Sequence, residues 1–292
     1  MILRWIVVAI TAVLITSISA NAVFAAPKKK FRAVQTWKQA YAEDWARDRI
    51  NQSVYKLDKN KLINTGKGAG ITIYVIDTGV GPDDCHGHGT VVASMAAGER
   101  YGIAADAGVI SVKALDCLGS GTEQQVKDAV DWVYENADPA TSVVNMSLGG
   151  PPTPSVDTAV ARLAAIMPVV VAAGNDSTNA CNVSPARVPA AITVAGYDRM
   201  NFRSIFSNYG PCVDVWAPGS AIDGVDKNGN RVQWSGTSMS TALVSGAIAY
   251  LADQHDLTTL DAAAKMRKDA ARPYLIDARL VGKSAYAVWI KD

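Results

Sequence analysis

The strongest constraint on the fold is a series of short apolar runs that alternate with helical patterns. The runs are rich in Val, Ile and Ala, hold few charges, and lie at 71–76, 108–115, 142–148, 167–173, 191–196 and 213–216. Strands of this kind are buried on both faces, as in parallel sheets that helices cover on both sides. The sequence therefore predicts an α/β domain built on a mostly parallel sheet.

Three segments carry helical signals. Residues 122–137 open with Thr122 and Gln125 spaced as a capping box, and an apolar stripe follows at Val126, Ala129, Val130 and Val133. Residues 238–252 contain no charged residue, which predicts a helix buried in the middle of the domain. Upstream, apolar residues at helical spacing predict an amphipathic surface helix at Val34, Trp37, Tyr41 and Trp45.

Length and charge limit the classes of protein to which the chain can belong. A chain of 292 residues that is 49% hydrophobic suits one large domain. Its formal net charge of +1 lacks the basic excess typical of nucleic-acid binding, so we expect no nucleic-acid partner.

The N-terminus has the pattern of an export signal. Arg4 precedes the uncharged apolar run 5–18, and Val23 and Ala25 place small residues at the −3 and −1 positions of a signal-peptidase site. A membrane anchor is the competing interpretation, but the run is short for a span of about 20 residues. We therefore expect residues 1–25 to be a cleaved signal peptide, with no membrane association afterwards. The protein is then secreted, with the periplasm as the alternative to the extracellular space.

Export gives the cysteines a structural meaning. The chain has four, Cys85, Cys117, Cys181 and Cys212, and an oxidising compartment favours disulfides over free thiols. Four cysteines allow three pairings. Pairing of sequence neighbours would close two loops of about thirty residues, each worth about 3–4 kcal/mol in the chain-entropy model.

Three polar motifs supply an acid, a base and a nucleophile. Asp77 follows the run 71–76, His88 opens a helical segment between Gly87 and Gly89, and Ser238 begins the uncharged helix. Each has an ordinary alternative role, as a turn aspartate, a structural histidine and an N-cap serine. Together they match acyl transfer, in which imidazole takes a hydroxyl proton and a carboxylate orients the imidazole. A serine at a helix N-terminus also offers its own N–H to a developing oxyanion.

Other polar and small residues fit the same chemistry. Asn175 follows the run 167–173, where an amide could donate to the oxyanion. Two small-residue stretches suit edge strands that pair with an extended peptide, Gly119, Ser120 and Gly121, and Ser147, Leu148 and Gly149. Ordinary turns are the alternative for all of these positions.

These motifs resemble the subtilisin-like serine proteases (subtilases), in particular the proteinase K-like branch with the aqualysin-type enzymes. The similarity runs from Trp45 to Leu251 and includes YVIDTG, DCHGHGTVVA, VVNMSLGG, VVVAAGND and SGTSMS, in the order Asp, His, Ser. The resemblance implies a three-layer α/β/α fold with a central, mostly parallel sheet over residues 45–292. It also implies a serine endopeptidase that acts on extended peptides or proteins and needs no cofactor for catalysis.

Carried over by motif, Asp77 resembles the orienting acid, His88 the general base, Ser238 the nucleophile and Asn175 the oxyanion donor. The stretches at 119–121 and 147–149 resemble the strands that flank the bound peptide. A wall of the primary specificity pocket is implied at Ala172, Ala173 and Gly174, and residues this small leave room for a large apolar side chain. The cysteine positions resemble an aqualysin-type pairing of Cys85 with Cys117 and Cys181 with Cys212.

The chain also departs from the family pattern. Only eleven positions separate Asp77 from His88, against about thirty in subtilisin. An extended segment of that length still reaches about 36 Å, so a triad is feasible, but the structural calcium that the family often holds near this segment becomes doubtful. Val91 follows HGT where the family usually has His, and Ala242-Leu243 follow SMST where it usually has Pro-His.

The segment 26–44 is the third departure. It carries a basic run at 27–32 and is too short for the folded inhibitory propeptide domain of relatives, since unaided domains need about 40 residues. Maturation then proceeds without such a domain or with an inhibitor or folding helper in trans. A catalytically impaired binding or regulatory protein and a peptide ligase or cyclase are the alternative functions. A zinc site at 83–88 is a competing interpretation of that motif.

Overall fold

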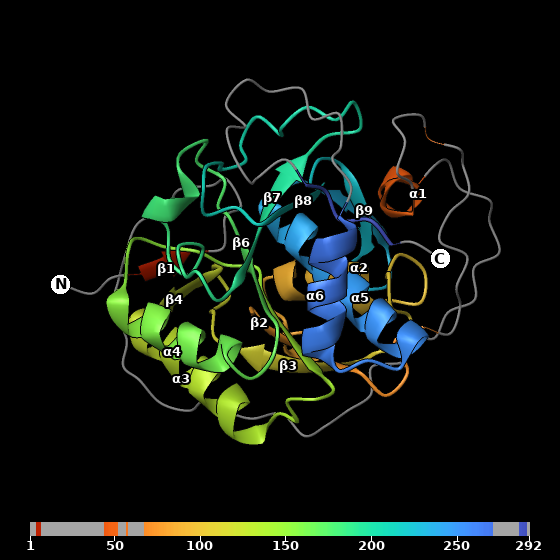
Figure 1. Ribbon diagram of the computed structural model, residues 1–292. Helices are drawn as coiled ribbons and strands as arrows, with labels where there is room; N and C mark the ends of the chain where they lie inside the picture. Colours follow the sequence, from red (N-terminus) through yellow and green to blue (C-terminus); the bar gives the residue numbers. More distant parts are fainter. Residues whose placement is uncertain (1–3, 7–43, 52–56, 58–66, 271–285, 291–292) are drawn as a thin grey trace.

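The computed structural model describes residues 4–6, 44–51, 57, 67–270 and 286–290. Its centre is a parallel six-stranded sheet in the order β3-β2-β5-β6-β7-β8. The strands are β2 (Thr72–Asp77), β3 (Gly108–Lys113), β5 (Ser142–Met146), β6 (Val169–Ala172), β7 (Ile192–Tyr197) and β8 (Val215–Pro218) (Figure 1). Each overlaps one of the six predicted apolar runs, and β8 begins two residues later than predicted. Thr72 of β2 lies opposite Gly108 on one side and Ser142 on the other.

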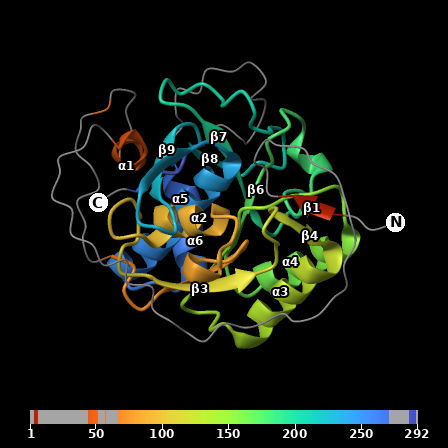
Figure 2. The same cartoon turned by 180° about the vertical axis from the view of Figure 1, so that it is seen from behind.

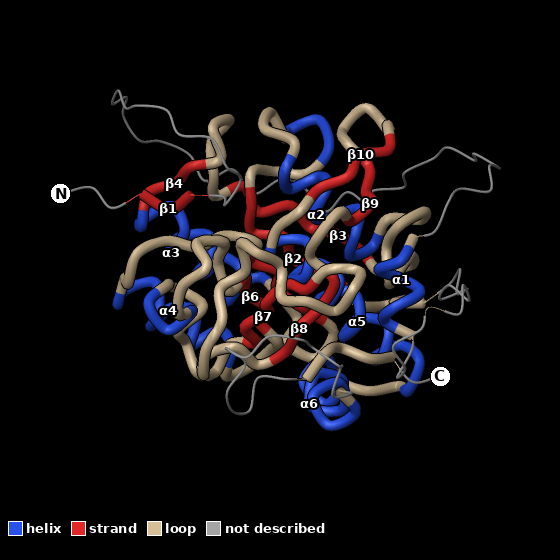
Figure 3. The backbone as a smooth tube through the Cα atoms, turned by 90° about the horizontal axis from the view of Figure 1, so that it is seen from above, coloured by secondary structure: helices blue, strands red, loops and turns tan. Residues whose placement is uncertain are grey.

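Helices cover both faces of this sheet. Helices α3 (Glu123–Asn136) and α4 (Pro154–Ala164) pack on one face, and α2 (His88–Ala97), α5 (Thr237–His255) and α6 (Thr259–Asp269) on the other (Figure 3). Along β2 the side chains alternate between the two layers, since Ile73 and Val75 join the α2–α5 core and Tyr74 and Ile76 the α3–α4 core. Burial on both faces explains why the strands carry few polar residues, and it confirms the three-layer α/β/α fold.

Two of the three predicted helices are confirmed with small shifts. Thr122 caps α3, and Thr122 and Gln125 form both bonds of a capping box. Helix α5 begins one residue before the predicted stretch and ends beyond it at His255, and its first sixteen residues, 237–252, are all buried. Its close contact with α2 depends on Gly246, where a Cβ would lie 2.5 Å from the Ala96 carbonyl oxygen.

The N-terminal predictions fall mostly outside the described residues. Within 1–25 the structure describes only β1 (Arg4–Ile6), which pairs antiparallel with β4 (Ser120–Thr122) beside α3 (Figure 2). The basic run 27–32 and the helical pattern from 34 to 43 are not described. The short helix α1 (Trp45–Ile50) begins at the last residue of that pattern.

The remaining elements are short. They are the hairpin of β9 (Ile222–Val225) and β10 (Arg231–Trp234) and two 3₁₀ turns, Gly81–Asp83 and Ala180–Asn182. Within the described part of the chain, none of the helices has the length and apolar character that a membrane span requires.

Candidate active site

The sheet and two helix N-termini bring the predicted acid, base and nucleophile to one edge of the molecule. Asp77 is the last residue of β2, His88 is the first residue of α2, and Ser238 is the second residue of α5. Carboxyl ends of parallel strands are the usual place for sites in α/β proteins. All three residues are at most 1% exposed, so each side chain is shielded from bulk water.

Asp77 and His88 form a buried pair. The Nδ1 of His88 lies 2.8 Å from Oδ1 of Asp77, and the Thr78 backbone N–H donates to the same oxygen at 2.7 Å. With Nδ1–H donating to the carboxylate, Nε2 is left as the proton acceptor of the neutral ring. The indole of Trp234 lies beside this imidazole, with ring centroids 5.7 Å apart. The geometry therefore holds the tautomer that a general base needs.

Ser238 is hydrogen-bonded to Ser147, the residue that follows strand β5. Its hydroxyl donates to the Ser147 carbonyl at 3.2 Å, and the Ser147 hydroxyl donates to the Ser238 carbonyl at 3.0 Å. Among the described residues no hydrogen bond joins Ser238 Oγ to His88. Proton transfer to His88 thus requires the hydroxyl to turn away from Ser147, and catalytic hydrogen bonds often tighten only when substrate is bound.

The amide of Asn175 is fixed in orientation. Its Oδ1 accepts from both the backbone N–H and the hydroxyl of Thr237, at 2.9 and 2.8 Å. Thr237 is the first residue of α5, so this contact places Asn175 next to the residue that precedes Ser238. Because the oxygen faces Thr237, the NH₂ group is the end of the amide that can serve as a donor.

The predicted peptide-binding residues lie in different settings. Gly119 adopts a positive φ of 72° just before β4, and Ser120 and Gly121 belong to β4, which already pairs with β1. Ser147 contacts Ser238, whereas Leu148 is buried in the α3–α4 core, so only its backbone could face a ligand. Gly149 is followed by a bridge from Gly150 to Ser184.

The predicted pocket wall lies at the end of β6. Ala172 and Ala173 are buried, and Gly174 has a φ of 100°. The Ala173 carbonyl accepts from Asn208 Nδ2 at 2.9 Å, which anchors this turn beside Asn175.

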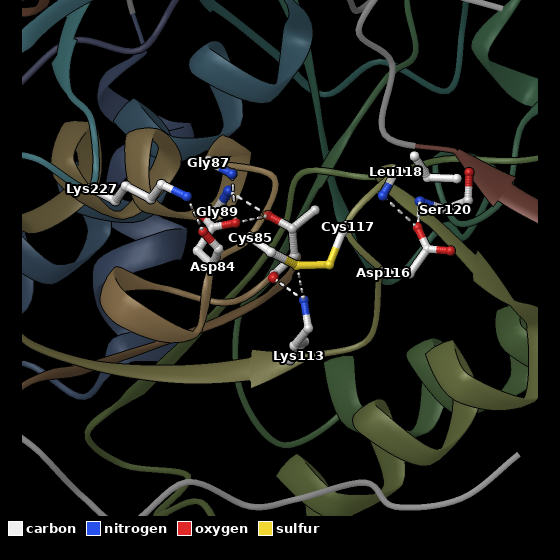
Figure 4. The surroundings of a disulfide bond; sticks show 11 residues. Asp84, Cys85, Gly87, Gly89, Lys113, Asp116, Cys117, Leu118, Ser120 and Lys227 are labelled. Carbon is white, nitrogen blue, oxygen red and sulfur yellow. Dashed lines mark hydrogen bonds between the residues drawn. A yellow bond between two sulfur atoms is a disulfide. The ribbon is translucent and has the colours of Figure 1, made fainter. Parts of the chain in front are cut away.

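Both disulfides implied by the resemblance are present. Cys85 pairs with Cys117, and Cys181 with Cys212. The first joins the Asp77–His88 segment to the turn before β4 (Figure 4). Lys113 lies beneath it, donating to the Thr78 carbonyl and lying 3.8 Å from Cys85 Sγ. Burial lowers the pKa of Lys113, opposed by the nearby carboxylates of Asp84 and Asp116.

The zinc interpretation of residues 83–88 is not supported. Cys85 is in a disulfide, His88 is bound to Asp77, and Asp84 accepts hydrogen bonds from the surrounding loop. Over the described ranges, no group of three or more His, Cys, Asp and Glu side chains is arranged to hold a metal ion.

Several residues of the site escaped sequence reasoning. Trp234 precedes the SGTSMS motif by one residue and packs on His88, and Thr237 inside that motif orients Asn175. In the sequence, Asp84 belongs only to the candidate zinc motif at 83–88. In the structure, its carboxylate organises the loop before His88. Position next to a recognised motif was the only signal for these residues in the sequence.

A buried Asp-His pair and a serine in the first turn of a helix, at the carboxyl edge of a parallel sheet, are an arrangement typical of subtilisin-like serine hydrolases. Residues 75–282 match the model of the subtilase family. The chain therefore belongs to that family.

Relatives agree with this assignment. The chain is 38% identical over 273 residues to an alkaline serine exoprotease A of Vibrio alginolyticus, covering 85% of this chain and 51% of that protein. It is 42% identical over 231 residues to an extracellular serine proteinase of a Thermus species, covering 70% of this chain and 56% of the relative. The chain thus spans little more than half the length of these relatives.

A solved structure matches the fold over most of the chain. The crystal structure of a cold-adapted subtilisin-like serine proteinase superimposes with a TM-score of 0.77 at 36% identity. The match covers 85% of this chain and 98% of that one.

Proposed function

We propose that this chain is a secreted serine endopeptidase that cleaves peptide bonds through an acyl-enzyme on Ser238. The observation that carries the proposal is the buried 2.8 Å contact between His88 Nδ1 and Asp77, at the sheet edge where Ser238 lies in the first turn of α5. Membership of the subtilase family and relatives named serine proteases support the same reaction.

The mechanism follows from the donors and acceptors in place. His88 Nε2 takes the Ser238 hydroxyl proton as Oγ attacks the scissile carbonyl carbon, and Asp77 stabilises the imidazolium. The Ser238 backbone N–H and the Asn175 amide donate to the oxyanion. His88 then protonates the departing amine, and a water molecule activated by the same imidazole hydrolyses the ester. Each proton has a protein donor or acceptor, so catalysis requires no cofactor.

We further propose that an extended substrate pairs with residues 119–121 and 147–149. The antiparallel pairing of β1 with β4 supports this, because a short extended segment already lies along β4. Ala172, Ala173 and Gly174 are the proposed wall of the primary pocket, where their small size favours a large apolar side chain.

Export is part of the proposal. Two disulfides are typical of oxidising compartments, and one relative is named an extracellular proteinase. Residues 1–25 are the proposed signal peptide and 26–44 a short segment ahead of the catalytic domain, with an inhibitor or folding helper in trans as the proposed partner. A structural calcium ion, if bound, would act on stability, so a chelator should leave the chemical steps unchanged.

The decisive experiment treats one sample of the oxidised wild-type protein with a fluorophosphonate and a second, unlabelled sample with an internally cleavable peptide. We expect one covalent adduct, located on Ser238 by peptide mass spectrometry, and two peptide fragments whose summed mass exceeds the substrate by one water. Joined fragments would indicate a ligase. A folded protein that captures peptide but takes no label would indicate a binding module and contradict the proposal.

Replacing Asn175 by alanine is expected to lower kcat by about 10²–10³-fold with little change in KM, because the lost donor acts mainly in the transition state. Steady-state kinetics on a peptide substrate measure the effect. Exposed Asn182, replaced by alanine, is the matched control and should retain wild-type kcat. A wild-type kcat in the Asn175 variant would remove Asn175 from the oxyanion hole.

A further inference from the structure

The carboxylate of Asp84 is the centre of the short segment between the acid and the base. It is fully buried and accepts four hydrogen bonds. Oδ1 receives the Thr78 hydroxyl at 2.8 Å and the Gly87 N–H at 2.6 Å. Oδ2 receives the backbone N–H and the hydroxyl of Thr90, at 2.8 and 2.7 Å.

These contacts reach both members of the Asp77–His88 pair. Thr78 follows Asp77 and accepts from the Gly89 N–H at 3.0 Å through its hydroxyl, while donating that hydroxyl to Asp84. Gly87 and Thr90 lie on either side of His88 at the start of α2. One carboxylate thus connects the residue after the acid to the residues around the base. Figure 4 shows the contact of Asp84 with Gly87.

Asp84 also replaces a missing helix cap. Gly87, the N-cap of α2, has no side chain to accept from the first turn, and the first N–H groups of a helix have no partner within it. Asp84 accepts from two of these backbone groups, and a carboxylate is favoured at the positive end of the helix dipole.

The surroundings hold the carboxylate charged. Burial alone raises the pKa of Asp84, but the hydrogen bonds from Thr90, Gly87 and Thr78 outweigh burial and hold the pKa below its ordinary value. Lys227 adds a contact to the Asp84 backbone carbonyl at 3.5 Å.

There is little room for His88 to shift. A Cβ at Gly89 would lie 2.1 Å from the Gly79 carbonyl oxygen and 3.1 Å from Asp77 Cβ, so the start of α2 packs directly on the β2 end. The position of His88 relative to Asp77 therefore depends on the hydrogen bonds that hold the segment between them. Asp84 accepts four of these hydrogen bonds.

We infer that Asp84 is a positioning residue for catalysis, whose carboxylate fixes the start of α2 so that His88 meets Asp77. This inference rests on the proposed function and deepens it. An eleven-residue interval orients the base through one internal carboxylate that bridges Thr78, Gly87 and Thr90. Asparagine cannot replace it, because all four partners are donors and one amide end is itself a donor.

The test compares Asp84→Asn with Asp83→Asn, which removes the adjacent, exposed carboxylate. Fluorophosphonate titration counts competent sites, and kcat is expressed per titrated site. We expect Asp84→Asn to lose about 10²-fold in kcat, the effect of misplacing a catalytic group by about 1 Å, with KM within about threefold of wild type. Asp83→Asn should match wild type. A purely structural role would lower the number of titrated sites and leave kcat per site unchanged, which would overturn the inference.

A second pair of variants decides the outcome if Asp84→Asn does not fold. Thr90→Val removes the hydroxyl that donates to Asp84, and Thr90→Ser keeps it. We expect a lower kcat per site in the valine variant and a wild-type value in the serine variant. Equal kcat values in both would overturn the inference. An unlabelled, inactive wild type would instead refute the proposed protease function, so the two failures are distinguishable.

Discussion

Replacing Ser238 by alanine is expected to lower kcat by about 10⁶-fold, the loss measured when the nucleophile of a serine triad is removed. The reaction then has no hydroxyl at the start of α5 for His88 to deprotonate, and no acyl-enzyme forms. Activity of about 10³–10⁴-fold over the uncatalysed reaction should persist, because Asn175 and the bound substrate geometry remain. Kinetics on a chromogenic peptide, with a correction for contaminating protease, measure the loss.

The matched control is Ser235→Ala, an exposed serine three residues before the nucleophile. Its Oγ accepts only from the Ala221 N–H among the described contacts, so its removal should leave kcat unchanged. The Ser238 variant should keep its fold, since among the described residues its hydroxyl donates one hydrogen bond, to the Ser147 carbonyl. A kcat within tenfold of wild type in folded Ser238→Ala would show that another group is the nucleophile.

Replacing Asp77 by asparagine is expected to lower kcat by about 10⁴-fold. If the amide oxygen takes the place of Oδ1, it still accepts from Thr78 and His88, but a neutral amide no longer stabilises the imidazolium. If the amide turns, its NH₂ faces His88 Nδ1, which must then accept. The proton moves to Nε2, and the ring cannot take the serine proton. Either orientation removes the base function without removing volume.

The kinetic pattern distinguishes this effect from a fold defect. Asp77→Asn should retain a KM within about threefold of wild type, because Asp77 is buried and cannot touch substrate. Its fluorophosphonate labelling rate should fall in parallel with kcat, since both reactions need the same deprotonated serine. A labelling rate equal to wild type would contradict the assignment of Asp77 as the orienting acid.

Much of the fold was predictable because its signals are local. Each of the six strands is a short apolar run buried on both faces, and the capping box of α3 needs only Thr122 and Gln125, three residues apart. The absence of charge from 238–252 predicted a buried helix, and α5 is buried from Thr237 to Ala252. The disulfide pairing was different, because composition left three pairings open and the resemblance selected one of them.

The sequence nominated the residues of the candidate site, but it did not predict how they are arranged. The order Asp77, His88, Ser238 identified the residues, but their contacts join positions far apart in the chain. The Ser238 hydroxyl rests on Ser147, and Thr237 orients Asn175 across a separation of 62 residues. Trp234 beside His88 is likewise a product of the β9–β10 hairpin folding over α2.

By itself, the sequence determined the order of strands and helices and the chemistry carried at three of their ends. This follows because hydrophobic period, capping and charge act over a few residues. Only the tertiary structure decided how the eleven-residue interval between Asp77 and His88 allows the two side chains to meet. The answer lies in the buried carboxylate of Asp84, whose four donors come together only when β2 and α2 pack against each other. Hydrogen bonds to a buried charge depend on burial and direction, and packing sets both.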